Sequence, residues 1–333
     1  MESDSIFKQF KTLVKNANCE ESFNVIPLLD MPHKLGVSKE GYPKFFVSTN
    51  DSVSAIQNII LEILSIEYNL SCSIIENGQV VKKEKFSIIT LRTLEASLQS
   101  YFIDIFIMML KKLPNIPSKR ELSVEVENLI TIFSALNKPP RQKIQGLWAE
   151  LLVIENSKDP ALLIKAWHES PSSKYDFTLG KDKIEVKSTS AEGRIHHFSL
   201  DQLNISANSQ LLVASIIVRE SGQGESGLSI QDLYDKICLR VSSIDLRLHL
   251  YSVIADTIGS DLSKIKNTYF DYIEASDSLA FYNANDVPHI DSSAIPQFVS
   301  DVKFISDMTN VTDIKNSKSK FDRTKSPLYM SLF

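Results

Sequence analysis

Two short segments, residues 175–179 and 184–187, constrain the fold of this chain more than any other feature, because apolar and polar residues alternate in both. A period of two residues is the signature of a β-strand with one buried face. The polar positions, which would share one face of a hairpin, are Asp176, Thr178, Glu185 and Lys187. The sequence therefore predicts a hairpin whose exposed face carries two carboxylates and an ammonium group.

The turn between the two segments decides which charged residues face each other. If Gly180 and Lys181 form a two-residue turn, with Gly first as in type II′, Asp176 lies opposite Glu185. If the turn is shifted by one residue, Asp176 lies opposite Lys187 instead. The same polar residues share a face in both cases.

Facing carboxylates repel each other unless a cation lies between them. Across an antiparallel pair, Asp176 and Glu185 would have Cβ atoms about 5 Å apart. Mg²⁺ takes oxygen ligands and is commonly held by one or two carboxylates, so it would turn this repulsion into binding. Lys187 could then orient a water molecule or offset charge on a phosphate. The pattern favours a phosphodiesterase site, and the alternative is a hairpin with ordinary charges on its solvated face.

Upstream, residues 141–154 are predicted to form a helix that begins just after Pro140. Its apolar arc consists of Ile144, Leu147, Trp148, Leu151, Leu152 and Ile154. Glu150 lies at the edge of the arc, one turn after Gly146. Glycine within a helix costs about 1 kcal/mol of stability relative to alanine. A reason for glycine at this position would be the close approach of another backbone or of a ligand. Alternatively, Glu150 is a solvated glutamate at the helix boundary.

This order of a helix with G-x-x-x-E, a strand with Asp and a strand with E-x-K resembles the PD-(D/E)XK nuclease superfamily, which includes many restriction endonucleases. More closely, GLWAE at 146–150, YDF at 175–177, EVKST at 185–189 and HFSLDQL at 197–203 are similar to a bacterial family of PD-(D/E)XK motif proteins. Members of that family are often encoded in phage-defence gene clusters. The resemblance covers roughly residues 140–220, and Tyr175 replaces the motif's proline, a change that the superfamily tolerates.

The resemblance implies roles for individual residues. Asp176 and Glu185 would bind Mg²⁺ or Mn²⁺, with the Val186 carbonyl as a further ligand. Lys187 would be the catalytic lysine, and Glu150 would complete the metal site or orient water. The implied function is that of a metal-dependent DNA endonuclease in a bacterial anti-phage or restriction system. Its partners would be DNA and other defence proteins, with a homodimer as a further option. The alternative is a catalytically inactive subunit of the same fold that binds DNA or a partner defence protein.

Residues near the predicted centre could also contact nucleic acid. The candidates are Lys181, Lys183, Arg194, His196, His197 and Gln202. Each has a structural alternative, namely solvated charge for Lys and Arg, or a strand end for the two His residues. Gln202 can also close a capping box with Ser199 at a helix start, and the cap is the interpretation we favour.

Composition narrows the class of protein. The net charge of −5 does not suit a dedicated, non-enzymatic DNA binder, which is usually basic, but it allows a nuclease with local positive charge. No signal-peptide core and no apolar run of about 20 residues is evident, so we expect a cytoplasmic protein without a membrane span. The three cysteines are far apart and suggest neither a disulfide framework nor a zinc site.

A G-x-G-x-x-G sequence at residues 222–227 matches the dinucleotide-binding fingerprint. Three residues separate it from the preceding strand, and Glu225 would face a pyrophosphate. Asp245, at the position of the ribose ligand, lies within a helical pattern. A polar loop is the better interpretation.

Overall, the chain is predicted to be α/β, with a restriction-endonuclease-like αβββαβ core around a central mixed sheet. Residues 1–115 would form an N-terminal α+β accessory domain for interaction or DNA docking, residues 118–240 the nuclease core, and residues 241–333 a C-terminal extension packed on the core. Further predicted elements are strands at 45–48, 70–75, 80–89, 211–218, 269–275, 279–282 and 302–305, helices at 90–112, 121–137, 229–239 and 244–257, an Asn-Gly turn at 77–78 and a solvated basic tail beyond 315.

Overall fold

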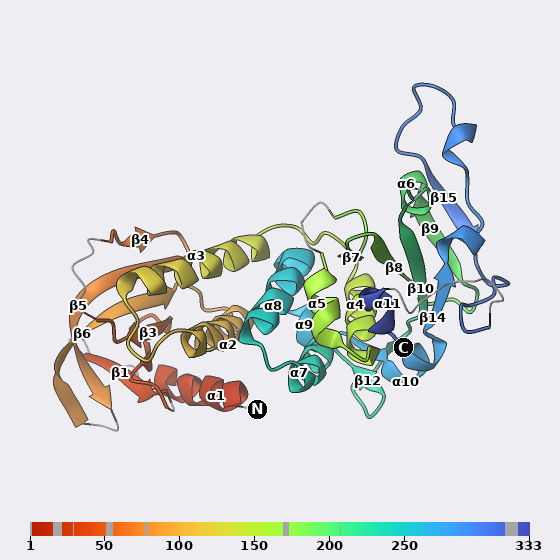
Figure 1. Cartoon of the computed structure of the whole chain (residues 1–333). Helices are drawn as coiled ribbons and strands as arrows, with labels where there is room; N and C mark the ends of the chain where they lie inside the picture. The colour runs from red at the N-terminus through yellow and green to blue at the C-terminus, as the bar shows by residue number, and fades with distance from the viewer. Residues whose placement is uncertain are drawn as a thin grey trace. The chain divides into compact units, whose positions relative to one another are not determined.

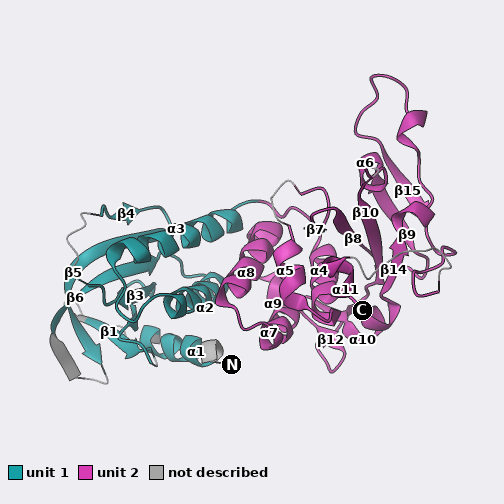
Figure 2. Ribbon diagram, viewed as in Figure 1, with its two compact units in different colours: residues 1–138 teal, residues 139–333 magenta. Residues whose placement is uncertain are grey.

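The computed structural model describes residues 2–15, 22–28, 30–50, 56–76, 79–168, 173–206, 208–316 and 326–333. The chain divides into two compact units, residues 1–138 and 139–333 (Figure 2). Helix α3 (Lys119–Leu136) belongs to the first unit, although the sequence analysis placed it with the nuclease core. Residues 241–333 lie in the same unit as most of that predicted core. The functions assigned to the three predicted segments stay predictions.

The first unit is a β-sheet with packed helices (Figure 1). Its remaining elements are α1 (Glu2–Lys15), β1 (Ser22–Pro27), β2 (Lys34–Val37), β3 (Pro43–Val47), β4 (Ile59–Ile60), β5 (Leu64–Glu76), β6 (Gln79–Leu91) and α2 (Ala96–Lys112). Within the described residues the strand order is β1-β2-β3-β6-β5-β4, and β1 also pairs in parallel with the far end of β5. Phe102 and Phe106 of α2 pack on Phe45 of β3, so aromatic side chains join helix and sheet.

The predicted helix at residues 90–112 begins later than expected. Thr90 and Leu91 still pair with β5 and therefore end strand β6, and α2 starts at Ala96. The strands predicted at 70–75 and 80–89 are confirmed and are longer, forming the β5–β6 hairpin. The predicted turn at 77–78 and most of the basic tail, residues 317–325, lie outside the described residues.

The second unit contains the predicted hairpin. Its elements are α4 (Ile144–Asn156), α5 (Pro160–Ala166), β7 (Phe177–Leu179), β8 (Asp182–Thr189), β9 (Ile195–Ser199), α6 (Leu200–Leu203), β10 (Gln210–Ile217), β11 (Glu220–Ser221), β12 (Gly227–Leu228), α7 (Ile230–Arg240), α8 (Ile244–Ile258), α9 (Lys264–Asn267), β13 (Tyr269–Asp271), α10 (Tyr272–Ser278), β14 (Ala280–Asn283), β15 (Lys303–Asp307) and α11 (Pro327–Met330). The main sheet has the order β14-β10-β8-β7. Strands β8 and β10 are parallel and the outer pairs are antiparallel, so the predicted mixed sheet is confirmed.

The chain order α4-α5-β7-β8-β9-α6-β10 contains the predicted αβββαβ sequence of elements, with the short helix α5 inserted after α4. Strand β9, however, pairs with β15 in a separate two-stranded sheet and is not hydrogen-bonded to β8 or β10. The architecture is therefore mixed α/β, and the restriction-endonuclease-like core stays a prediction. The strand predicted at 269–275 is wrong beyond Asp271, because the side chain of Asp271 accepts a hydrogen bond from the Glu274 amide and starts helix α10.

Helix α4 packs on β8 and on α7 and is buried over most of its length. It begins at Ile144, three residues later than predicted, with Lys143 in an extended conformation before it. The glycine-rich loop at 222–227 joins the short strands β11 and β12, which both pair with β13. None of the helices in the described part of the chain combines the length and the apolarity needed to cross a bilayer.

Candidate functional site

The β7–β8 hairpin places Asp176 directly across from Glu185. Phe177, the first residue of β7, pairs with Ile184, and continuing this register by one residue sets Asp176 across from Glu185. Gly180 has a φ of +59° and Lys181 does not have a positive φ, the combination found in type II′ turns. Of the two predicted registers, the first is therefore confirmed, and Lys187 follows Glu185 on the same face.

The carboxylate of Glu185 lies at the centre of a polar network. Glu185 is only 4 % exposed, and its Oε1 accepts hydrogen bonds from Lys187 Nζ at 2.6 Å and Gln202 Nε2 at 2.5 Å. The Lys187 ammonium also donates to Gln202 Oε1 at 3.3 Å and lies 4.9 Å from the ring centroid of Phe198. The other oxygen, Glu185 Oε2, is buried and accepts no hydrogen bond from the described residues. A buried carboxylate oxygen without a partner is costly unless a cation satisfies it.

Gln202 has a second role at the start of helix α6. Its backbone amide donates to Ser199 Oγ and its side-chain Oε1 accepts from the Ser199 amide, which completes the predicted capping box. The same side chain contacts Glu185 and Lys187. The cap and a role in the site are therefore compatible, whereas the sequence analysis treated them as alternatives.

Glu150 is a buried residue of the site, and its interpretation as a solvated glutamate is wrong. Its side chain is 3 % exposed. Glu150 Oε1 accepts from Gln142 Nε2 at 2.8 Å, and Oε2 accepts from Trp167 Nε1 at 2.7 Å. A Cβ atom at Gly146 would lie 3.3 Å from Gln142 Oε1, so the missing side chain makes room for this amide. The close neighbour of Gly146 is thus a side chain, where a backbone or ligand was expected.

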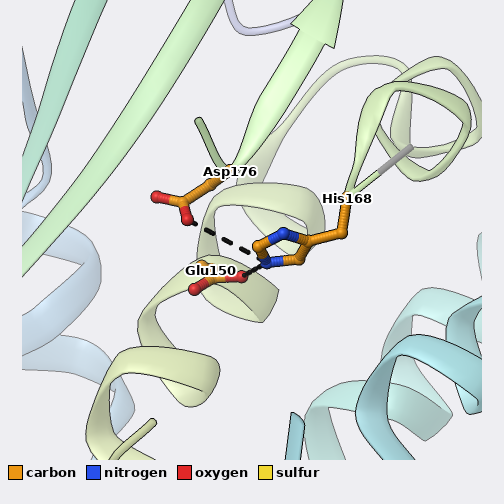
Figure 3. A group of neighbouring side chains, drawn as sticks. All are labelled: Glu150, His168 and Asp176. Carbon is orange, nitrogen blue, oxygen red and sulfur yellow. Dashed lines mark hydrogen bonds and ion pairs between the residues drawn. The ribbon is translucent and has the colours of Figure 1, made fainter. Parts of the chain in front are cut away.

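His168 joins Glu150 and Asp176, as Figure 3 shows, with its imidazole ring directed between the two carboxylates. His168 Nε2 lies 2.9 Å from Glu150 Oε2 and 3.9 Å from Asp176 Oδ1. Sequence reasoning missed this residue. Trp167 forms an isolated antiparallel bridge with Phe177, so His168 is the next residue across from Asp176. The sequence carries no periodic signal for His168, because this residue lies outside the regular strands and is set across from Asp176 by a single bridge.

Burial and neighbouring negative charges raise the pKa values of both carboxyl groups of the hairpin. Burial, followed by the charges of Glu185 and Glu150, raises the pKa of Asp176 well above its ordinary value, although the Val186 amide donates to Asp176 Oδ2 at 2.7 Å. Burial also raises the pKa of Glu185, and the adjacent Lys187 ammonium opposes that shift. Neighbouring buried carboxyl groups with raised pKa values are typical of functional sites.

The chain matches a family model over residues 10–309, and that family is described as "Putative PD-(D/E)XK family member, (DUF4420)". The protein belongs to this PD-(D/E)XK family. Comparison with curated proteins and with solved structures gives no match. Membership supports a nuclease-like protein, and the hairpin brings together residues of the types in the family's name, an Asp and an E-x-K.

The residues gathered around the hairpin fit a divalent cation. One carboxylate oxygen of Glu185 is buried and unsatisfied, and the β7–β8 register sets the residue Glu185 across from Asp176. Glu150, His168 and Asp176 each offer one atom to a group in which all three atoms lie within 4.8 Å of one another. Carboxylate oxygens are the ligands that Mg²⁺ and Mn²⁺ accept in proteins. Asp176 and Glu185, with Glu150 beside them, are the residues that would hold such an ion.

Two predicted nucleic-acid contacts have their polar groups in internal hydrogen bonds. The Arg194 guanidinium donates to Ser215 O at 2.7 Å and to the Ser278 carbonyl at 2.5 Å. His196 is 3 % exposed and contacts Ser215 Oγ at 2.8 Å, and burial lowers its pKa to about 4. A phosphate contact by either side chain would first have to break these bonds.

The remaining candidates lie nearer the surface. Lys181, in the hairpin turn, and His197, on β9, are exposed. The Lys183 ammonium contacts the Lys181 carbonyl at 3.3 Å and lies 5.8 Å from the ring centroid of Tyr175. The Val186 amide orients Asp176, and metal binding by its carbonyl stays a prediction.

Proposed function

We propose that this protein is a divalent-metal-dependent DNA endonuclease that serves as the nuclease of a bacterial anti-phage or restriction system. The observation that carries the proposal is the pairing of Asp176 with a buried, unsatisfied Glu185, with Lys187 held beside them. Family membership supports a nuclease. The assignment to defence rests on the resemblance to the bacterial proteins described above, and DNA as the substrate rests on the same resemblance.

In the proposed reaction, water attacks the phosphorus of the DNA backbone, the bond to the leaving oxygen breaks, and that oxygen takes up a proton. A bound Mg²⁺ or Mn²⁺ would polarise the phosphate and activate the water. Asp176 and Glu185 would hold the ion through their carboxylate oxygens. Hydrogen-bond donors would position the two carboxylates while the ion is bound. The Val186 amide donates to Asp176, and the Gln202 side chain donates to Glu185.

Lys187 is placed to act on the phosphate or on the attacking water. Its ammonium is partly exposed, with 17 % of the side chain accessible, and it is held by Glu185, Gln202 and the face of Phe198. A fixed positive charge next to the metal ligands would stabilise charge that builds up on the phosphate oxygens. Glu150 accepts hydrogen bonds from Gln142 and Trp167, which fix its carboxylate beside His168 and Asp176, where it would complete the metal site.

A cleavage assay on modified and unmodified DNA, with Mg²⁺ or Mn²⁺, tests this function. We expect Asp176→Ala, Glu185→Ala and Lys187→Ala each to abolish cutting while circular dichroism shows an intact fold. Asp182→Asn is the matched control. It removes one negative charge from β8, the strand that carries Glu185, at a position outside the site, and it should leave cleavage at the wild-type level. Wild-type cutting by Asp176→Ala would refute the assignment. Absence of cutting of any DNA form, with metal bound, would favour the inactive binding subunit.

A further inference from the structure

His168 is one of three potential metal ligands that form a row across three neighbouring chain segments. The Trp167–Phe177 bridge sets His168 across from Asp176, and the β7–β8 register sets Asp176 across from Glu185. The His168 amide donates to the Asp176 carbonyl at 2.9 Å, which fixes the two residues at the backbone. Three potential ligands are therefore placed by consecutive pairings, although they are far apart in sequence.

The backbone of His168 is in the left-handed region, with a φ of +40°. A residue other than glycine adopts this backbone conformation at a cost in free energy, and such residues are found preferentially at functional sites. Here the conformation accompanies an imidazole that lies between Glu150 and Asp176, with 25 % of the side chain exposed (Figure 3). The local strain is thus associated with a directed imidazole.

The distances suit direct coordination. Two ligand atoms, each 2.0–2.1 Å from one octahedral ion, lie about 3.0 Å apart when adjacent and about 4.2 Å apart when opposite. His168 Nε2 lies 2.9 Å from Glu150 Oε2 and 3.9 Å from Asp176 Oδ1. Glu150 already accepts hydrogen bonds from Gln142 and Trp167, so its carboxylate does not depend on a proton from His168.

We propose that His168 is a nitrogen ligand of the metal ion and that it makes the site select a transition-metal ion such as Mn²⁺ over Mg²⁺. Imidazole nitrogen binds first-row transition metals well, whereas Mg²⁺ prefers oxygen ligands and retains its water. The second, independent observation is the buried Glu185 Oε2, which has no hydrogen-bond partner among the described residues and belongs to the residue that the β7–β8 register sets across from Asp176. The inference rests on the metal-dependent function proposed above, and it specifies which ion that function uses.

Pulsed electron paramagnetic resonance of Mn²⁺ bound to the full-length protein tests the ligand directly, because an imidazole ligand couples its ¹⁴N nucleus to the ion. We expect ¹⁴N modulation in the wild-type protein and its loss in His168→Asp, which still binds Mn²⁺ through oxygen. Aspartate tolerates the left-handed backbone, so this variant keeps the local conformation. His289→Gln, a change at an exposed histidine away from the cluster, should keep the modulation.

Competition between Mn²⁺ and Mg²⁺ tests the selectivity. His168→Asp should lower the ratio of Mn²⁺ to Mg²⁺ affinity by about tenfold or more relative to the wild-type protein. The inference is overturned if the wild-type protein fails to bind Mn²⁺, if bound Mn²⁺ shows no ¹⁴N coupling, if the coupling persists in His168→Asp, or if both proteins have the same ratio. The two proposals fail separately. A nitrogen ligand without DNA cleavage would overturn only the nuclease, and cleavage without a nitrogen ligand would overturn only the role of His168.

Discussion

Replacing Asp176 by Asn should stabilise the metal-free protein while it removes metal binding. The substitution removes one negative charge from a buried group and retains an oxygen that can accept from the Val186 amide. The facing atoms of Asp176 and Glu150 lie within 4.8 Å. At an effective dielectric constant of about 20, two like charges at that distance repel by about 3.5 kcal/mol. Loss of attraction to Lys187 offsets part of this, so we expect a net gain of roughly 1–2 kcal/mol.

Both tryptophans, Trp148 and Trp167, lie in residues 139–333, so tryptophan fluorescence reports the unfolding of the second unit. For a unit of this size, 1 kcal/mol shifts the midpoint by about 2–4 °C, which predicts a rise of roughly 3–6 °C for Asp176→Asn in EDTA. Asp182→Asn should change the unfolding free energy by less than about 0.5 kcal/mol. A variant less stable than wild type in EDTA would show that the carboxylates are not under mutual repulsion.

The pH dependence supplies an internal check on the same variant. Because the pKa of the Asp176 carboxyl is raised in the folded state, the folded protein binds a proton at this site more tightly than the unfolded chain does. The metal-free wild type therefore gains stability as the pH falls through the window between the raised value and the ordinary 3.8. The difference between wild type and Asp176→Asn should narrow as the pH falls, and a constant difference would contradict the electrostatic explanation.

Three further predictions use other parts of the chain. His33 is 1 % exposed, and burial lowers its pKa to about 4. The unfolded state therefore binds more protons than the folded state between about pH 6.5 and pH 4, so the protein loses stability as the pH falls through this window. Urea unfolding followed by circular dichroism should show that the unfolding free energy falls by about 2 kcal/mol from pH 7 to pH 5, and that this loss is absent in His33→Gln. Trp167→Phe removes a donor to the Glu150 carboxylate, whereas Trp148→Phe removes a donor to a neutral carbonyl, so the first should cost about 1 kcal/mol more in denaturant titrations. Equal costs would argue against a charged Glu150. Mn²⁺ at about 100 times its dissociation constant should raise the unfolding free energy of the second unit by about 2.7 kcal/mol, and Asp176→Asn should abolish the shift.

The central part of the site could be predicted because it depends on local patterns. The alternation around Asp176 and Glu185 identifies the shared face, and a Gly-first turn gives one of the two possible registers, which is the one that the structure has. The helix that carries Glu150 was also predicted, with an error of three residues at its start. Local periodicity identified these elements because each side chain points where its own strand or helix directs it.

The missed features depend on tertiary contacts. His168 reaches the site through a single bridge and a left-handed backbone, and neither leaves a periodic signal in the sequence. The burial of Glu150 depends on donors from Gln142 and Trp167, which lie outside its own helical arc. The separate pairing of β9 depends on β15, more than 100 residues later in the chain, and sequence patterns carry no information about partners at that separation.

The shared role of Gln202 links the order of Lys187 to a very short helix. Helix α6 has four residues, and helices of this length open readily on their own. Each opening that breaks the contact between the Gln202 amide and Ser199 would also withdraw an oxygen from the lysine ammonium. Fraying of this single turn would therefore remove one of the contacts that hold Lys187, next to its contact with Glu185, and hydrogen exchange at the Gln202 amide would report the fraying.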